Sequence, residues 1–122
     1  MKTLQYDYTR ENDDELHRLD EWMSAAGDAD RKTIMPLMEK IKNEMTRGVC
    51  HFTFTKVSGE RRDAYGTRLS SVIDRYVETK GGNRPRERRS FSGTFPYFDL
   101  VRRDWRCFRV DKLVSMDADY GE

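Results

Sequence analysis

The segment that most constrains the fold runs from residue 97 to residue 113 and reads YFDLVRRDWRCFRVDKL. Two short runs of aromatic and β-branched residues flank Arg102-Arg103-Asp104, and such runs on either side of a polar turn are typical of a β-hairpin. The second run alternates large rings with guanidinium groups. Because successive side chains of a strand point to opposite faces, such a strand can contribute to a core and present charge to solvent. The segment therefore indicates a binding surface more strongly than a catalytic site.

The charge of the chain is unevenly distributed. The 122 residues have a net charge of +1, but residues 1–30 contain nine acids and only three bases, so the remainder is basic. An acidic front and a basic remainder can attract each other or serve two different partners. Charged residues form 37% of the chain, well above the usual share for a globular domain, which predicts either a small core or a part of the chain that is loosely held.

The sequence predicts a cytoplasmic protein. It has no apolar run of about 18 residues that could span a membrane, and its first residues lack the apolar region of a signal peptide. We therefore expect no membrane partner. The two cysteines, Cys50 and Cys107, each fall in a predicted strand and are expected to be buried free thiols.

Hydrophobic spacing in residues 1–47 predicts an antiparallel helical hairpin. In the first helix, residues 12–26, Asn12 and Glu15 match a capping box. In the second, residues 34–46, Pro36 falls in the first turn, where its missing N–H is harmless. Apolar residues at helical spacing form one stripe on each helix: Leu16, Leu19, Trp22 and Met23 on the first, and Ile34, Leu37, Met38, Ile41 and Met45 on the second.

After Gly48 the hydrophobic period changes to that of strands. Strands are predicted at residues 49–57, 60–67, 94–101, 105–111 and 112–116, whereas residues 70–79 fit a helix turn or a strand. Short, strongly bent antiparallel strands of this number can close into a small barrel. The predicted fold is therefore α+β: an N-terminal helical hairpin (1–47), a small antiparallel SH3/Sm-like β-barrel (48–116) and an acidic tail (117–122).

Two stretches of the predicted barrel resemble the WYL family. Residues 52–62, FTFTKVSGERR, look like the opening of a WYL-type domain, and residues 97–113 match the ending typical of that family, Tyr-x-Asp-Leu followed by Trp-Arg-x-Phe-Arg-Val-Asp-x-Leu. The chain resembles in particular the short WYL-like proteins of phages and prophages that have an Sm-like SH3 barrel. The resemblance covers residues 49–116. It implies a barrel that serves as a ligand- or nucleic-acid-sensing regulatory module and not as an enzyme.

The basic residues near the C-terminus are the first candidate site. Guanidinium groups suit bidentate recognition of phosphate or carboxylate, and Trp105 either stacks on a ligand or packs behind the arginines. Strand alternation places Arg106 and Arg109 on opposite faces, so one clamp can include both only if the strand bends. The alternative is that these arginines are simply solvated around a core Trp. The predicted ligand-binding residues are Arg102, Arg103, Arg106, Arg109, Trp105, Lys80, Arg84, Arg86, Arg88 and Arg89.

The last five of these belong to residues 80–90, a basic segment with the composition of a loop. Such a segment either tracks phosphates in a salt-sensitive manner or is a solubilising connection.

The acidic first helix is the second candidate site. Its carboxylates either form a solvated face, or mimic nucleic acid, or dock on a basic host protein. Its apolar stripe packs on the second helix or the barrel by default, and otherwise on a dimer or partner groove. The residues concerned are Asp13, Asp14, Glu15, Asp20, Glu21 and Trp22.

The sequence shows no pattern of catalytic residues. Cys50 and His51 are adjacent, so in a strand they point to opposite faces and cannot form a dyad. His17 and His51 are far apart in the sequence, and no ligand at metal-binding spacing follows His51. We therefore predict no enzymatic activity, no cofactor and no metal site. The leading hypothesis is a small regulator that binds nucleic acid or a nucleotide-like anionic ligand through barrel arginines. The alternative is a phage-encoded module that modulates a host protein in the host cytoplasm through the acidic helix. Under both hypotheses the chain could form a homo-oligomer.

Overall fold

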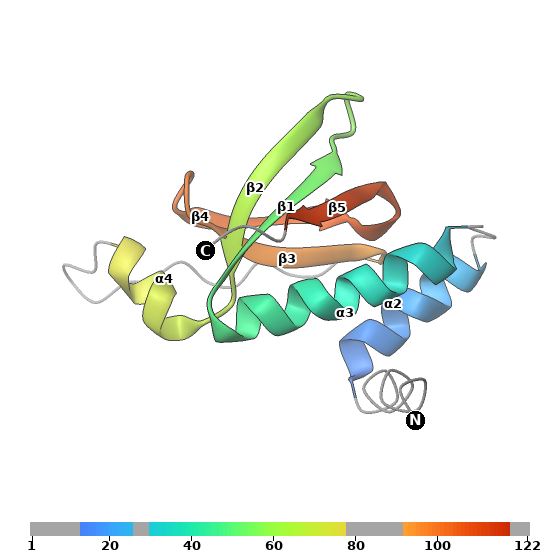
Figure 1. The fold of residues 1–122 in the computed structure, drawn as a ribbon, viewed down its shortest axis with the longest axis horizontal. Helices are drawn as coiled ribbons and strands as arrows, with labels where there is room; N and C mark the ends of the chain where they lie inside the picture. Colours follow the sequence, from blue (N-terminus) through green and yellow to red (C-terminus); the bar gives the residue numbers. More distant parts are fainter. Residues whose placement is uncertain (1–12, 26–29, 78–91, 118–122) are drawn as a thin grey trace.

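The computed structural model describes residues 13–25, 30–77 and 92–117. Within these ranges two helices come first, and five strands follow them with a short helix between the second and the third (Figure 1). In chain order the elements are α2 (Asp14–Ala25), α3 (Arg31–Arg47), β1 (Val49–Thr55), β2 (Arg61–Thr67), α4 (Ser70–Tyr76), β3 (Thr94–Asp99), β4 (Asp104–Arg109), the 3-10 turn η1 (Val110–Lys112) and β5 (Leu113–Asp117). No helix within these ranges is both long and apolar enough to cross a membrane.

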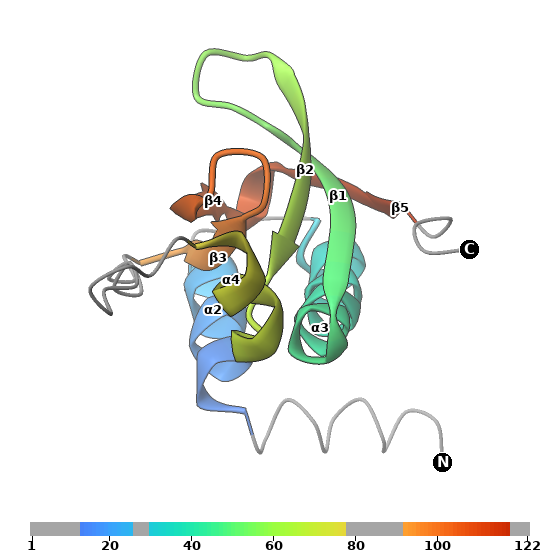
Figure 2. The same cartoon turned by 90° about the vertical axis from the view of Figure 1, so that its left-hand side faces the viewer.

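The five strands form one antiparallel sheet in the order β4-β3-β2-β1-β5. β4 and β5 are therefore at opposite edges, yet only η1 connects them. The connection from Arg109 to Leu113 can span at most about 14 Å, whereas four strand spacings in a flat sheet would separate the edges by about 19 Å. The sheet must therefore be strongly curved, as Figure 2 shows. This curved sheet behind two helices confirms the α+β, SH3/Sm-like prediction.

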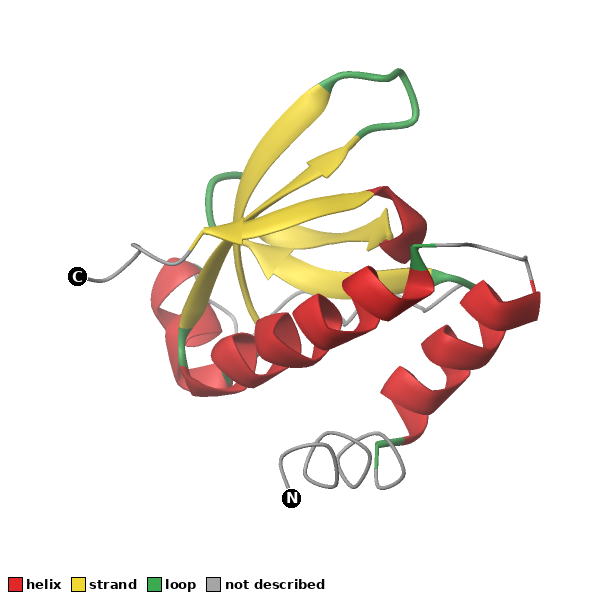
Figure 3. Cartoon of the chain, turned by 45° about the vertical axis from the view of Figure 1, so that its right-hand side comes forward, coloured by secondary structure: helices red, strands yellow, loops and turns green. Residues whose placement is uncertain are grey.

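One hydrophobic core fills the space between the helices and the curved sheet, and Figure 3 shows α2 and α3 on the same side of the strands. Rings from strands that are not neighbours in the sheet meet in this core. The centroids of the Phe54 ring of β1 and the Phe108 ring of β4 are 5.3 Å apart. Curvature thus brings β1 over β4. The fully buried members of the core include Met23, Met38, Ile41 and Met45 from the helices and Phe52, Phe95 and Tyr97 from the strands.

A smaller apolar cluster lies on the other face of β3 and β4, beneath α4. Strand pairing places Phe98 opposite Trp105 on this face, and the core face carries the neighbouring pair Tyr97 and Arg106. Val72 and Ile73 of α4 pack against the two rings. The ambiguous stretch at residues 70–79 is therefore a helix over 70–76, because it covers this second apolar face.

The helix boundaries differ slightly from the prediction. The carboxylate of Asp13 accepts the backbone N–H of Leu16 at 3.1 Å, so Asp13 caps α2; the predicted cap, Asn12, lies outside the described residues. α3 begins at Arg31, which places Pro36 in the second turn of the helix and not the first. At the other end of the chain, β5 includes Asp117, which the sequence had placed in the tail.

Candidate functional site

The acid of the Tyr-x-Asp-Leu motif builds the turn between β3 and β4. Asp99 is fully buried, and its Oδ1 accepts the backbone N–H groups of Val101 at 2.9 Å and Arg102 at 3.0 Å. Its Oδ2 forms an ion pair with Arg62 at 3.2 Å. The next residue of the turn, Arg103, has a φ of 58°, which is uncommon for a side chain of this size. The motif therefore has a structural role.

This turn fixes the positions of three predicted site residues. Arg102 and Arg103 are exposed at the turn, and the Arg103 guanidinium lies 5.8 Å from the Tyr76 ring centre. Trp105 is only 6% exposed and meets Phe98 edge-on at 5.9 Å. Trp105 therefore packs behind the arginines, as the second of the two alternatives predicted, and offers no plane to a ligand.

A cavity of about 470 Å³ lies between the β1–β2 hairpin and β4. Buried rings of Phe54, Tyr97 and Phe108 form the apolar part of its lining. Burial, together with the nearby Asp99 carboxylate, raises the pKa of Tyr97, so its phenol stays neutral. Among the described residues that line the cavity there is no carboxylate, but there are five cations: Lys56, Arg62, Arg106, Arg109 and Lys112.

Three of these cations pair with a carboxylate just outside the lining. The pairs are Arg62–Asp99 at 3.2 Å, Lys56–Glu60 at 3.3 Å and Arg109–Asp111 at 2.7 Å. Arg106 and Lys112 have no hydrogen bond or ion pair from their side chains within the described part of the chain. The cavity therefore retains two positive charges that no acid of the described chain balances, and such a site attracts anions.

Arg106 and Arg109 both line this cavity even though strand alternation separates them. Arg106 lies opposite Tyr97 and Arg109 opposite Thr94, so they occupy opposite faces of β4. Arg106 is on the core face, at its rim, beside the buried Phe108. Arg109 reaches the same cavity from the last position of β4, where the chain turns into η1. The bend that a shared clamp requires is therefore at the end of the strand.

Comparison with known proteins identifies the family of this barrel. A family model described as WYL_2, Sm-like SH3 beta-barrel fold, matches residues 38–114, more than half of the chain. The chain belongs to the WYL_2 family. A similar protein is the uncharacterized 11.5 kDa protein in the Gp31–cd intergenic region of Enterobacteria phage T4, which is 28% identical over 82 residues, 67% of this chain and 78% of the phage protein. No solved structure matches. The WYL_2 match includes all five cavity cations and excludes α2.

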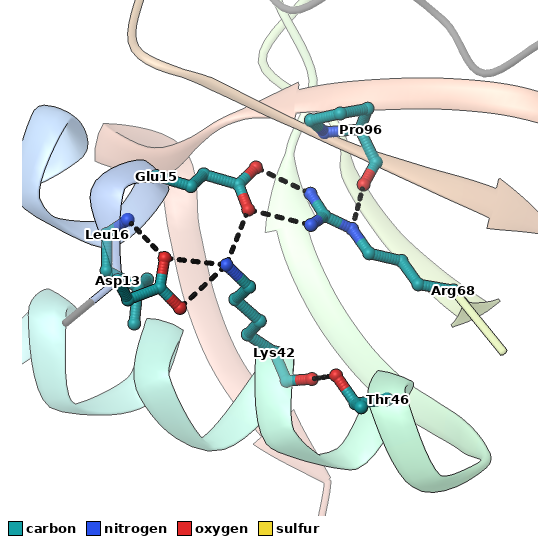
Figure 4. A network of polar contacts seen from close by, with 7 residues as sticks. All are labelled: Asp13, Glu15, Leu16, Lys42, Thr46, Arg68 and Pro96. Carbon is teal, nitrogen blue, oxygen red and sulfur yellow. Dashed lines mark hydrogen bonds and ion pairs between the residues drawn. The ribbon is translucent and has the colours of Figure 1, made fainter. Parts of the chain in front are cut away.

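The acids at the start of α2 hold this helix to the WYL_2 barrel (Figure 4). The Arg68 guanidinium donates two hydrogen bonds to the Glu15 carboxylate, each 2.7 Å long, and a third to the Pro96 carbonyl at 2.9 Å. Lys42 of α3 lies 2.7 Å from Asp13 and 2.9 Å from Glu15. Burial alone would raise the pKa of Glu15, but the hydrogen bonds and charges of Arg68 and Lys42 outweigh it and lower that pKa.

Of the remaining predicted residues of α2, some contact the rest of the protein and others are exposed to solvent. Asp20 pairs with Arg31 of α3 at 2.8 Å. Trp22 packs so closely on Gly93 that a Cβ there would lie 2.5 Å from its ring. Asp14 is exposed, and Glu21 lies 3.1 Å from His17 of the same helix. Three of the five candidate acids therefore bind cations of α3 or Arg68, the residue that follows β2, which leaves a small acidic surface.

Sequence reasoning identified only part of the cavity. The predicted loop residues Lys80, Arg84, Arg86, Arg88 and Arg89 lie outside the described residues. The cavity residues Lys56, Arg62 and Lys112 were not predicted as ligand-binding. Lys56 and Arg62 belong to the β1–β2 hairpin, far along the chain from Arg106, and only the curvature of the sheet brings them to it. The one available signal was that they fall inside the stretches resembling the WYL family.

Proposed function

We propose that this WYL_2 protein is a small, non-enzymatic regulatory module that binds nucleic acid or a nucleotide-like anionic ligand in the cavity between the β1–β2 hairpin and β4. The observation that supports this most is a lining with five cations and no carboxylate among its described residues. The cavity volume of about 470 Å³ is in the range of small-molecule sites. The similarity to a phage T4 protein favours action in the cytoplasm of a bacterial host.

The cavity cations would contribute to ligand binding in two ways. Arg106 and Lys112 have no acid to pair with in the described chain, so a phosphate can bind them without breaking an existing ion pair. Arg62 and Arg109 are already oriented by Asp99 and Asp111, which lowers the side-chain entropy lost on binding. Val57, 93% exposed beside the cavity, adds an apolar surface for a base or sugar.

A titration with labelled single strands tests this function. We expect fluorescein-labelled oligothymidylate or the matching RNA to bind at ~50 mM salt and to lose affinity steeply as salt rises, because each neutralised phosphate releases counterions. Unlabelled nucleotides that compete for the site would show that one phosphate-bearing unit is sufficient. If neither strand nor any nucleotide binds at ~50 mM salt, the proposal is wrong.

A matched pair of variants tests where on the protein the ligand binds. Arg106→Gln removes a charge that lines the cavity, and Arg102→Gln removes the same charge from the exposed β3–β4 turn. Arg106→Gln should weaken binding about tenfold, because one charge-assisted contact with the ligand is lost. Arg102→Gln should change the dissociation constant less than about twofold. Equal losses in the two variants would reject the cavity as the site.

Docking on a host protein through α2 is the weaker alternative, because Asp13, Glu15 and Asp20 already bind cations of this chain. The exposed Asp14 and Glu21 would have to supply the contact. A pull-down with the variant Asp14→Asn/Glu21→Gln tests it. Recovery of the same partner by this variant and by the wild-type protein would reject the alternative.

A further inference from the structure

A second group of polar side chains lies on the face of the sheet opposite the core, where β2, β1 and β5 run side by side. His51, Asp63 and Asp117 each place one potential ligand atom within 4.8 Å of the other two. The Nε2 atom of His51 is 3.3 Å from Oδ2 of Asp117. None of these residues lines the cationic cavity, so this group is a separate site.

Strand pairing explains why the three side chains converge. Asp117 of β5 lies directly opposite His51 of β1. Asp63 of β2 lies opposite Thr53, which is two positions from His51 and therefore on the same face. Directly opposite and diagonal neighbours on one face of a sheet are within reach of each other. Three adjacent strands thus contribute one ligand each.

Neighbouring side chains hold these ligands in place. The Thr53 hydroxyl lies 2.7 Å from Asp63 and 3.3 Å from Asp117, between the two carboxylates. The His51 ring stacks on Tyr65 with a centroid distance of 4.2 Å and an interplanar angle of 7°. Contacts of this kind orient metal ligands before the ion binds.

The electrostatics of the group favour a cation. Asp63 and Asp117 are two carboxylates that approach the same point, and like charges so close repel each other. The Nε2 atom of His51 is shielded from water and has no hydrogen-bond partner in the described chain. A buried nitrogen and two carboxylates together supply three ligands for a divalent ion.

We propose that His51, Asp63 and Asp117 bind a divalent transition-metal cation of the Zn²⁺ type. Two ligands about 2.1 Å from a tetrahedral Zn²⁺ are about 3.4 Å apart, which agrees with the 3.3 Å between His51 and Asp117. An imidazole ligand suits Zn²⁺, whereas Mg²⁺ prefers oxygen ligands alone. Three protein ligands leave a fourth position to water. The ion would tie β5 to β1 and β2.

NMR of the untagged full-length protein tests this proposal without a mutation. The chain has only two histidines, so His17 is an internal control for His51. One equivalent of ZnCl₂ in a non-chelating buffer should shift the imidazole nitrogen signals of His51 and leave those of His17 in place, and MgCl₂ should shift neither. No shift of His51, an equal shift of His17, or an equal response to MgCl₂ would overturn the proposal.

Calorimetry on variants gives a second, independent measurement. His51→Gln and Asp117→Asn should each weaken Zn²⁺ binding by at least about tenfold, and His17→Gln should leave it unchanged. Thermal melts in the presence of a chelator verify that each variant is folded, and Zn²⁺ should raise the melting temperature of the wild type and of His17→Gln only. Unchanged affinity in folded His51→Gln and Asp117→Asn would reject these residues as ligands.

Discussion

Two groups of charged side chains in this small protein differ in whether their positive charges are balanced by carboxylates. Where α2 meets α3 and the residue that follows β2, the carboxylates of Asp13 and Glu15 face Lys42 and Arg68 at 2.7–2.9 Å, and each positive charge is balanced. In the cavity, five cations meet only three nearby carboxylates, so two charges remain. The amount of charge in a region therefore does not by itself indicate a binding site. Balanced charges hold elements together, and unbalanced charges are available to a ligand.

The largest expected effect is on stability, at Arg68. Arg68→Met removes two hydrogen bonds to Glu15, one to the Pro96 carbonyl, and a contact with the Phe95 ring, whose centre lies 3.8 Å from the guanidinium. Because a largely buried carboxylate loses one of its two cationic partners and keeps only Lys42, we expect the free energy of unfolding to fall by about 3 kcal/mol. Urea denaturation measures the change.

The matched control is an ion pair of similar length on the surface. Arg47 lies 3.2 Å from Glu44, and both side chains are well exposed. Arg47→Met should therefore cost less than about 0.5 kcal/mol. If Arg68→Met and Arg47→Met cost the same, the balanced group would not hold α2 to the barrel.

A smaller effect is expected from pH. The pKa of Glu15 is lower in the folded protein than its reference value of 4.5, so the charged carboxylate favours the folded state. This stabilisation is complete above the unfolded-state pKa and is lost as pH falls through the folded-state pKa. The stability difference between wild type and Glu15→Gln should therefore be constant near neutral pH and shrink below about pH 4. A difference that stays constant down to about pH 3 would contradict the lowered pKa of Glu15.

The smallest expected effect on stability is at the cavity. Arg106→Gln and Lys112→Gln remove charges that have no acid to balance them in the described chain. Each should change the free energy of unfolding by less than about 0.5 kcal/mol, in the direction of higher stability, because repulsion among the cavity cations is relieved. Urea denaturation at low and high salt measures this. A loss above about 1 kcal/mol in either variant would show that these charges hold the fold.

Local sequence patterns were sufficient to predict most of the fold. Helical stripes, strand alternation and the motif at residues 97–113 each depend on residues close together in the chain, and the resulting elements agree with the structure to within a few residues. The motif also includes Asp99, whose role in a turn is local.

The sites depend on long-range contacts that these patterns do not contain. Arg68 binds an acid of α2 that is 53 positions away, and the acidic stretch therefore looked more available than it is. Lys56 joins Arg106 only because β1 curves over β4. His51 meets Asp63 and Asp117 across three strands, so no spacing along the chain indicates that they share a site.

The most direct test compares the two charged groups in one titration. We propose to follow the backbone and arginine side-chain NMR signals of the full chain as a short oligothymidylate is added at ~50 mM salt. The signals of Arg106, Arg109 and Lys112 should shift, and those of Lys42 and Arg68 should not. Shifts centred on Lys42 and Arg68 or on the Arg102–Arg103 turn, or no shifts at all, would contradict the assignment of ligand binding to the cations of the cavity.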